Sequence, residues 1–188
     1  MSRIALTVVF MIFLFSQGLT SKVLALATFI IASGTDFFDG YLARRRNEIS
    51  VFGKFMDPLA DKILVISAFL AFVEMKLVPA WIVVIIVFRE FIITGLRLVA
   101  LAKGENVEAE AIGKHKTVSQ MVSIYVILLF IIFKESSASL FGSWNANMDY
   151  ILKEIVFYMM LFTGLLTLVS GISYVIRNKH FFINAKNS

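Results

Sequence analysis

The chain has no cysteine and only two histidines and two prolines in 188 residues. The lack of cysteine excludes disulfides, zinc-thiolate sites, haem attachment and a thiol nucleophile. Two histidines, His115 and His180, are too few for a histidine-rich metal site. Charged residues make up 16% of the chain and hydrophobic residues 59%, against about 25% and 45–50% in average globular chains. These deficits exclude a disordered chain and an enzyme with a polar surface all round, and they favour one membrane domain, residues 1–188.

Long apolar stretches dominate the remaining sequence, and the mean hydropathy is +0.85. A helix needs about 20 residues to cross a hydrocarbon layer of about 30 Å. We therefore predict an all-α integral membrane protein with six transmembrane helices. The stretches are Ile4–Phe15, Lys22–Leu42, Pro58–Phe72, Pro79–Leu101, Val118–Phe133 and Ile151–Val175.

The first stretch is short and has a second interpretation. Arg3 before it and Ser16-Gln17-Gly18 after it also fit a secretory signal peptide. Cleavage there would leave five spans and place the two termini on opposite sides of the membrane.

Basic residues are unevenly divided between the two ends of the predicted helices. With six spans and a cytoplasmic N-terminus, thirteen of the eighteen Lys and Arg residues fall on the cytoplasmic side and four on the other, and Arg89 lies inside a span. This is the positive-inside bias of multi-pass membrane proteins, and it supports keeping the first span. It also accounts for the net charge of +5 without a nucleic-acid partner.

Aspartate is concentrated at one junction between spans. Four of the five aspartates lie within Asp36–Asp61, where the second and third stretches meet. A charged carboxylate at the centre of a membrane helix costs about 2.5–3.5 kcal/mol, so acids in such helices indicate function. The alternative is that all four are ordinary loop residues in the headgroup region, since Arg44–Arg46 and Lys54 lie between them.

Helical spacing argues against that alternative. Two helical stripes each combine two carboxylates with two small residues: Asp36, Asp39, Gly40 and Ala43, and then Gly53, Asp57, Ala60 and Asp61. Paired carboxylates bind hard divalent cations such as Mg²⁺ or Mn²⁺, and four close acids repel one another unless cations neutralise them. We therefore predict a cytoplasmic site for two metal ions. Pro58 indicates that the third helix either starts near it or kinks there.

The complete pattern resembles a family signature. Asp36-x2-Asp39-Gly40-x2-Ala43-Arg44-x8-Gly53-x3-Asp57-x3-Asp61 matches every fixed position and gap of the CDP-alcohol phosphotransferase signature. Further runs are similar to the phosphatidylglycerophosphate synthase branch of that family, namely 53–62, Arg89-Glu90, Thr94-Gly95-Leu96-Arg97 and Gly113-Lys114-x-Lys116-Thr117. The resemblance extends from about Ile30 to the last helix. Members usually begin with an amphipathic segment containing Pro-Asn and Leu-Thr-x-x-Arg, of which Arg3 is the one remnant here.

The resemblance implies a reaction and roles for the residues. An acceptor alcohol displaces CMP from a CDP-linked donor, at an active site on the cytoplasmic end of the bundle. Asp36, Asp39 and Asp57 are the expected metal ligands, and Asp61 is the expected general base, in contact with the second ion as well. The expected nucleotide-binding residues are Asp36, Gly40, Ala43, Arg44 and Gly53.

A basic set on the later spans is predicted to bind the acceptor: Arg89, Arg97, Lys114 and Lys116. Arg89 lies deep in an apolar stretch, so it needs a partner or a polar cavity, and Glu90 is the expected partner for one of the arginines. Such a set selects a phosphorylated alcohol, and sn-glycerol 3-phosphate is the natural acceptor for a CDP-diacylglycerol donor. Lys114, Lys116 and Arg97 alternatively serve only as topology signals, an interpretation that does not apply to Arg89.

The resemblance implies a multi-pass enzyme of a bacterial plasma or inner membrane, in contact with membrane lipids. Gly164, Ser170 and Gly171 favour close helix packing or a homodimer. Other acceptors (inositol phosphate, serine or phosphatidylglycerol) stay open. A cation transporter is the alternative from another class, but its acids would be spread over several helices and repeated halves. A prenyl-diphosphate transferase would space its aspartates differently.

Overall fold

The computed structural model describes the backbone of residues 2–46, 51–102, 111–141 and 145–177 and the side chains of residues 3–34, 62–100, 116–137 and 145–177. Its elements are α1 Ser2–Phe15, α2 Leu19–Arg46, α3 Val51–Glu74, α4 Ala80–Ala102, α5 Ala111–Phe141 and α6 Ala146–Arg177. Each predicted apolar stretch coincides with a different helix, which confirms the all-α fold with six helices.

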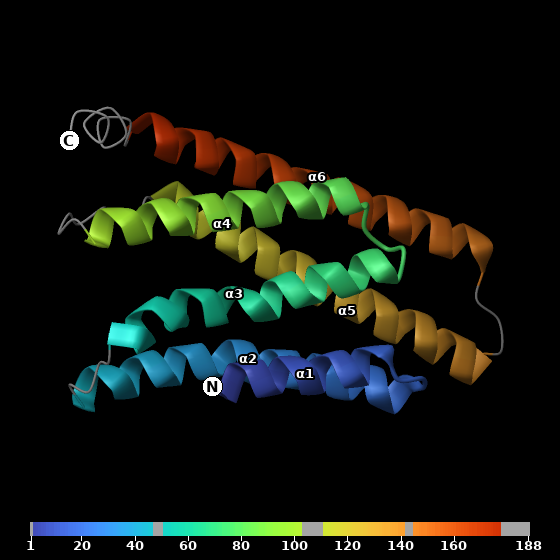
Figure 1. Ribbon diagram of the computed structural model, residues 1–188. Helices are drawn as coiled ribbons and strands as arrows, with labels where there is room; N and C mark the ends of the chain where they lie inside the picture. Colours follow the sequence, from blue (N-terminus) through green and yellow to red (C-terminus); the bar gives the residue numbers. More distant parts are fainter. Residues whose placement is uncertain (1, 47–50, 103–110, 142–144, 178–188) are drawn as a thin grey trace.

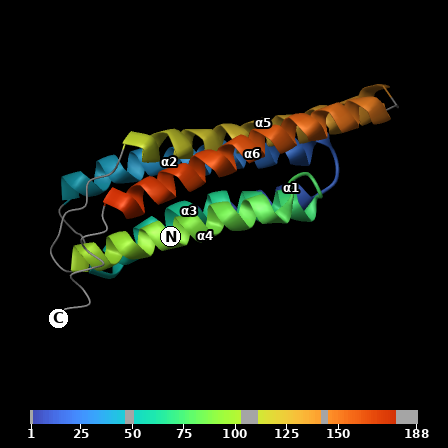
Figure 2. The same cartoon turned by 90° about the horizontal axis from the view of Figure 1, so that it is seen from above.

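The helices run along one another in an elongated bundle (Figures 1 and 2). The end of α2, the start of α3, the end of α4, the start of α5 and the end of α6 lie at the same end of the bundle, on the left in Figure 1. We call this the carboxylate end, because the part of α2 and α3 that carries Asp36–Asp61 lies there. Helix α1 has 14 residues against 28 in α2, and it starts part-way along the bundle.

Helix α3 begins at Val51 and runs through Pro58 to Glu74. Of the two alternatives for Pro58, a helix start near it is therefore excluded. Proline lacks the N–H that would donate to the carbonyl one turn earlier in the helix. The residues of α3 that precede Pro58 are nevertheless helical from Val51 on. As a result, Gly53, Asp57 and Asp61 share one helix, as their spacing requires.

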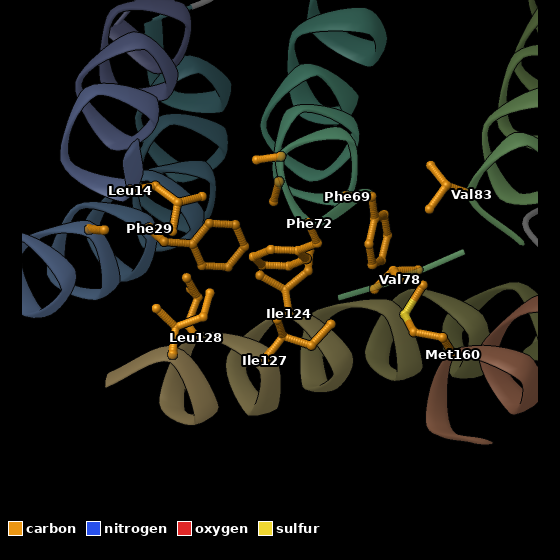
Figure 3. Close-up of a cluster of buried hydrophobic side chains, with 14 of the residues drawn as sticks. Leu14, Phe29, Phe69, Phe72, Val78, Val83, Ile124, Ile127, Leu128 and Met160 are labelled. Carbon is orange, nitrogen blue, oxygen red and sulfur yellow. The ribbon is translucent and has the colours of Figure 1, made fainter. Parts of the chain in front are cut away.

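The core lies between α1, α2, α3 and α5 and continues to α4 and α6. Phe29, Phe72 and Ile124 lie near its centre and are fully buried, as the close-up in Figure 3 shows. The Phe29 ring packs edge-on against Tyr125 with centroids 5.4 Å apart and is tilted against Phe10 at 5.5 Å. Moving one such side chain from water into an apolar core stabilises the folded state by about 1.5–3 kcal/mol.

Helix α1 is an integral part of this core. It packs against α2 and α3 and buries Phe10 and Leu14 completely. This packing favours a helix of the bundle over a signal peptide for the first apolar stretch.

Two helices are long and apolar enough to cross a membrane within the part of the chain whose side chains are described. They are Lys116–Ser137 in α5 and Ala146–Arg177 in α6. Arg3–Phe15 and Leu19–Gly34 are shorter apolar helices. Many large apolar side chains face outward, among them Phe88, Tyr158 and Phe162, as expected where lipid is the solvent.

At the opposite end of the bundle, Lys22 holds the turn between α1 and α2. Its Nζ donates to the carbonyl of Leu14 at 2.6 Å and to that of Ser16 at 2.8 Å, and the residue is 9% exposed. Gly18 adopts a φ of 95°, where a side chain would be strained, and its N–H donates to Glu135 of α5 at 3.2 Å. The last carbonyls of α1 thus receive a charged donor from α2.

We expect Lys22→Met to lower the free energy of unfolding by about 1–3 kcal/mol, because one buried and one part-buried carbonyl would lose their donor. The measurement is thermal unfolding of the detergent-solubilised protein. Lys153→Met is the matched control, since Lys153 also has a partner, Asp149 at 2.7 Å, but is 46% exposed. Equal losses in the two variants would contradict this account of Lys22.

Candidate active site

The predicted metal- and nucleotide-binding residues belong to two helices whose ends meet. Four connecting residues separate Arg46, the last residue of α2, from Val51, the first of α3, and the two helices are in contact. The residues predicted to bind the metal ions and the nucleotide are Asp36, Asp39, Gly40, Ala43, Arg44, Gly53, Asp57 and Asp61. Their side chains lie outside the described part of the structure. The side chain of Lys114 on α5 also lies outside it.

The donor set on these helices fits a divalent metal ion. Four carboxylates and no histidine or cysteine occur in the two stripes, and oxygen-only ligands suit Mg²⁺ or Mn²⁺. Among the side chains that the structure does describe, no group of three or more carboxylates and histidines could hold a metal. The backbone of α2 and α3 places the sequence positions of the four aspartates at the carboxylate end.

A cluster of charged side chains surrounds Glu90, which is buried on α4. Lys62 of α3 contacts Glu90 Oε2 at 2.8 Å and the Glu90 carbonyl at 3.1 Å, and it also donates to Thr94 Oγ1. Lys116 of α5 forms an ion pair with Glu90 Oε1. Gln120 reaches the same oxygen at 3.4 Å. We call Lys62, Arg89, Glu90 and Lys116 the charge cluster.

Arg89 extends the charge cluster to α6. Its guanidinium lies 3.4 Å from Glu90 Oε1 and donates to Ser170 Oγ at 2.7 Å. Gly171 makes this reach possible, because a Cβ at that position would lie 2.9 Å from Cγ of Arg89. One carboxylate thus connects α4 to α3 and α5 directly and to α6 through its neighbour.

Hydroxyl groups continue the polar packing between α5 and α6. Thr163 Oγ1 lies 2.7 Å from Ser119 Oγ and 3.0 Å from Ser123 Oγ, and it is fully buried. Inside an apolar bundle such groups must find partners within the protein. These contacts fix α6 against the helix that carries Lys116.

The structure brings together two of the four predicted acceptor residues. Arg89 and Lys116 are both buried and both contact Glu90, so the expected pairing of an arginine with Glu90 is confirmed. Arg97 lies further along α4 and is exposed.

The pairing of Lys62 with Glu90 was not predicted from the sequence, where Lys62 was counted only as a positive charge on the cytoplasmic side. The available signal was that Lys62 and Glu90 both lie inside predicted apolar stretches, where each needs a partner of opposite charge. Gly164 and Gly171 were predicted to allow close packing, and they do so against Ile82 and Arg89 of α4.

Comparison with known proteins identifies relatives along nearly the whole chain. The sequence model of the CDP-alcohol phosphatidyltransferase family matches residues 1–176. A Rickettsia bellii protein named CDP-diacylglycerol–glycerol-3-phosphate 3-phosphatidyltransferase is 33% identical over 184 residues, which cover 96% of this chain and 93% of the relative. A Rickettsia typhi protein of the same name is 34% identical over 93% of this chain and 90% of its own length. The Bacillus subtilis protein of that name is 52% identical over 101 residues, 54% of this chain and 52% of the relative.

We expect Gly171→Ala to lower the free energy of unfolding by about 1–3 kcal/mol, because its Cβ would force Arg89 or α6 to move. Gly95→Ala is the matched control on α4, since nothing lies within 4 Å of its Cβ position. The control variant is expected to be neutral or stabilised by up to about 1 kcal/mol through helix propensity. Thermal unfolding in detergent measures both, and a neutral Gly171→Ala variant would contradict the tight contact.

Proposed function

Because the chain belongs to the CDP-alcohol phosphatidyltransferase family, we propose that it transfers the phosphatidyl group of CDP-diacylglycerol to sn-glycerol 3-phosphate. The products are phosphatidylglycerophosphate and CMP, and the reaction is a step of phospholipid biosynthesis. The observation that carries this proposal is the complete aspartate signature on α2 and α3, two helices whose ends meet. The names of relatives that match nearly the whole chain support the choice of donor and acceptor.

The proposed reaction is a displacement at phosphorus. The acceptor hydroxyl oxygen forms a bond to the phosphorus that carries the diacylglycerol, and the bond from that phosphorus to the oxygen of CMP breaks. Asp61 accepts the proton of the acceptor hydroxyl. Arg44 offers a charge-assisted contact to the nucleotide, while Gly40, Ala43 and Gly53 leave room for it.

Members of this family use divalent metal ions, and the four aspartates supply suitable oxygen ligands. We propose that Asp36, Asp39 and Asp57 would hold two ions, Mg²⁺ or Mn²⁺, with Asp61 shared between this task and proton transfer. Bound there, the ions would neutralise the negative charge of the diphosphate and of the leaving CMP.

The charge cluster supports a negatively charged acceptor. Three cations of the cluster, Lys62, Arg89 and Lys116, share the carboxylate of Glu90. The surplus of positive charge in a buried site favours a phosphate group, which Arg89 and Lys116 would bind together with Arg97 and Lys114. A neutral or zwitterionic alcohol would gain less from this site.

The proposed setting is a bacterial plasma or inner membrane. All six helices cross it, with both termini and the carboxylate end on the cytoplasmic side, as the distribution of basic residues favours. The acyl chains of the donor then remain in the lipid while its headgroup reacts at the surface. We further propose that the chain is a single catalytic domain and works as a homodimer.

Purified protein is expected to release CMP from CDP-diacylglycerol only when sn-glycerol 3-phosphate and Mg²⁺ or Mn²⁺ are supplied. Replacing the acceptor by serine is expected to reduce CMP release to background, because a zwitterion gains less from the basic site. Inositol phosphate and phosphatidylglycerol carry a phosphate group, so they are tested beside sn-glycerol 3-phosphate, which is expected to give the highest CMP release. CMP release from one of these acceptors instead would reassign the acceptor within the same chemistry. Metal flux in proteoliposomes without any CMP release would favour a transporter and overturn the proposal.

Asp61→Asn is expected to lower CMP release by about 10²–10⁴-fold, because the amide cannot accept the acceptor proton. Thermal unfolding and binding of CDP-diacylglycerol should stay close to those of the unmodified protein. Asp149→Asn is the matched control, since Asp149 lies on α6 outside the signature and pairs with Lys134 and Lys153. Turnover retained in Asp61→Asn would remove this residue as the base.

A further inference from the structure

The charge cluster contains one feature that the proposed chemistry leaves unexplained. Glu90 is buried, and its two carboxylate oxygens bind lysines of different helices. Oε2 contacts Lys62 of α3 at 2.8 Å, and Oε1 contacts Lys116 of α5. Lys62 follows Asp61 directly in the sequence. A single side chain of α4 therefore lies between the turn that carries the proposed base and a lysine proposed to bind the acceptor.

The contacts of Lys62 restrict how α3 can turn about its axis. Its Nζ has three acceptors on α4: the Glu90 carboxylate, the Glu90 carbonyl at 3.1 Å and the Thr94 hydroxyl. In a helix of 3.6 residues per turn, the direction of one side chain fixes those of its neighbours. With Lys62 held toward α4, the rotation of α3 about its own axis is fixed relative to α4.

The contacts of Lys116 restrict α5 in the same way. Lys116 is 7% exposed, and Gln120, one turn further along α5, reaches the same oxygen of Glu90 at 3.4 Å. Behind Glu90, Arg89 is bonded to Ser170 of α6 at 2.7 Å, so α4 itself is held from the other side. Without the carboxylate, Lys62, Arg89 and Lys116 would repel one another in a site of low dielectric.

We propose that Glu90 is a positioning residue that holds the α3 turn bearing Asp61 in register with Lys116 of α5, one carboxylate oxygen to each lysine. This inference rests on the proposed function, because Asp61 and Lys116 have roles only in that reaction. Glu90 touches neither substrate in this account and acts through the two lysines. Its effect is to set the distance between the proton acceptor and the bound acceptor alcohol.

Glu90→Gln tests the proposal, because the amide keeps the size of the side chain and loses the second charged acceptor oxygen. We expect kcat to fall by about 100-fold, since a misplacement of about 1 Å has effects of that size. The KM for sn-glycerol 3-phosphate should rise at least several-fold, while the KM for CDP-diacylglycerol changes by less than about twofold. A purely structural role would reduce the amount of active protein and leave both KM values unchanged, which would overturn the proposal.

Glu135→Gln is the matched control for stability. Glu135 is a half-buried acid at the opposite end of the bundle, where it accepts from the Gly18 N–H at 3.2 Å. This variant should unfold at a lower temperature with unchanged KM values. Lys62→Met should reproduce the fall in kcat, and combining it with Glu90→Gln should add little, because both changes remove the same contact. Additive losses in the double variant would contradict the proposal.

A second measurement does not depend on turnover. Because the chain has no cysteine, Ile66→Cys on α3 and Val118→Cys on α5 provide a unique pair of spin-label sites. In Glu90→Gln the distance distribution between the labels should shift or broaden, and in Glu135→Gln it should stay unchanged. An unchanged distribution in Glu90→Gln would overturn the inference even if turnover fell. Absence of CMP release from the unmodified protein would instead refute the proposed function, while the label distances would still show whether Glu90 holds α3 and α5 in register.

Discussion

Charge neutralisation inside an apolar bundle is the constraint on which the rest of this structure depends. Lys62, Arg89 and Lys116 each come from a helix that is otherwise rich in apolar residues, and Glu90 contacts all three. A buried ion pair adds little net stability against a well-packed apolar alternative, whereas losing one partner leaves an expensive unpaired charge. The charge cluster is therefore better explained as a device for holding α3, α4 and α5 in one arrangement than as a source of stability.

The close packing of α6 near this cluster also depends on finding partners for buried polar groups. Arg89 can reach Ser170 because Gly171 leaves space where a Cβ would lie 2.9 Å from Arg89 Cγ. Earlier on α6, Thr163 contacts Ser119 and Ser123 of α5, so small and hydroxyl-bearing residues form the α6 interfaces with both α4 and α5. Large aromatic side chains, among them Phe29 and Phe72, are instead fully buried in the apolar core (Figure 3). The described bundle thus combines apolar core packing with a set of buried polar contacts on α4, α5 and α6.

Much of this architecture was predictable from the sequence because it depends on local patterns. Six apolar stretches gave six helices, and the spacing of Asp57 and Asp61 fits a single α3. The start of α3 stayed open between two alternatives, because proline normally marks a helix boundary and here Pro58 lies inside the helix. The link from Lys62 to Glu90 was missed because its partners lie 28 residues apart on different helices, and no periodicity within one helix reveals which residues of two helices meet. The side chains of the four aspartates lie outside the described residues, so their shared site stays a prediction.

The placement of charge along the bundle also bears on why this chemistry belongs in a membrane protein. A donor with acyl chains and a water-borne, charged acceptor can meet only where apolar surface and buried charge are adjacent. Helix α4 supplies both, because Phe88 and Phe91 face outward while Arg89 and Glu90, between them in sequence, are buried. The 3.6-residue period separates these two environments by less than one turn of the same helix. The outward apolar surface and the buried charges of α4 are thereby coupled rigidly, and a movement of either must move the other.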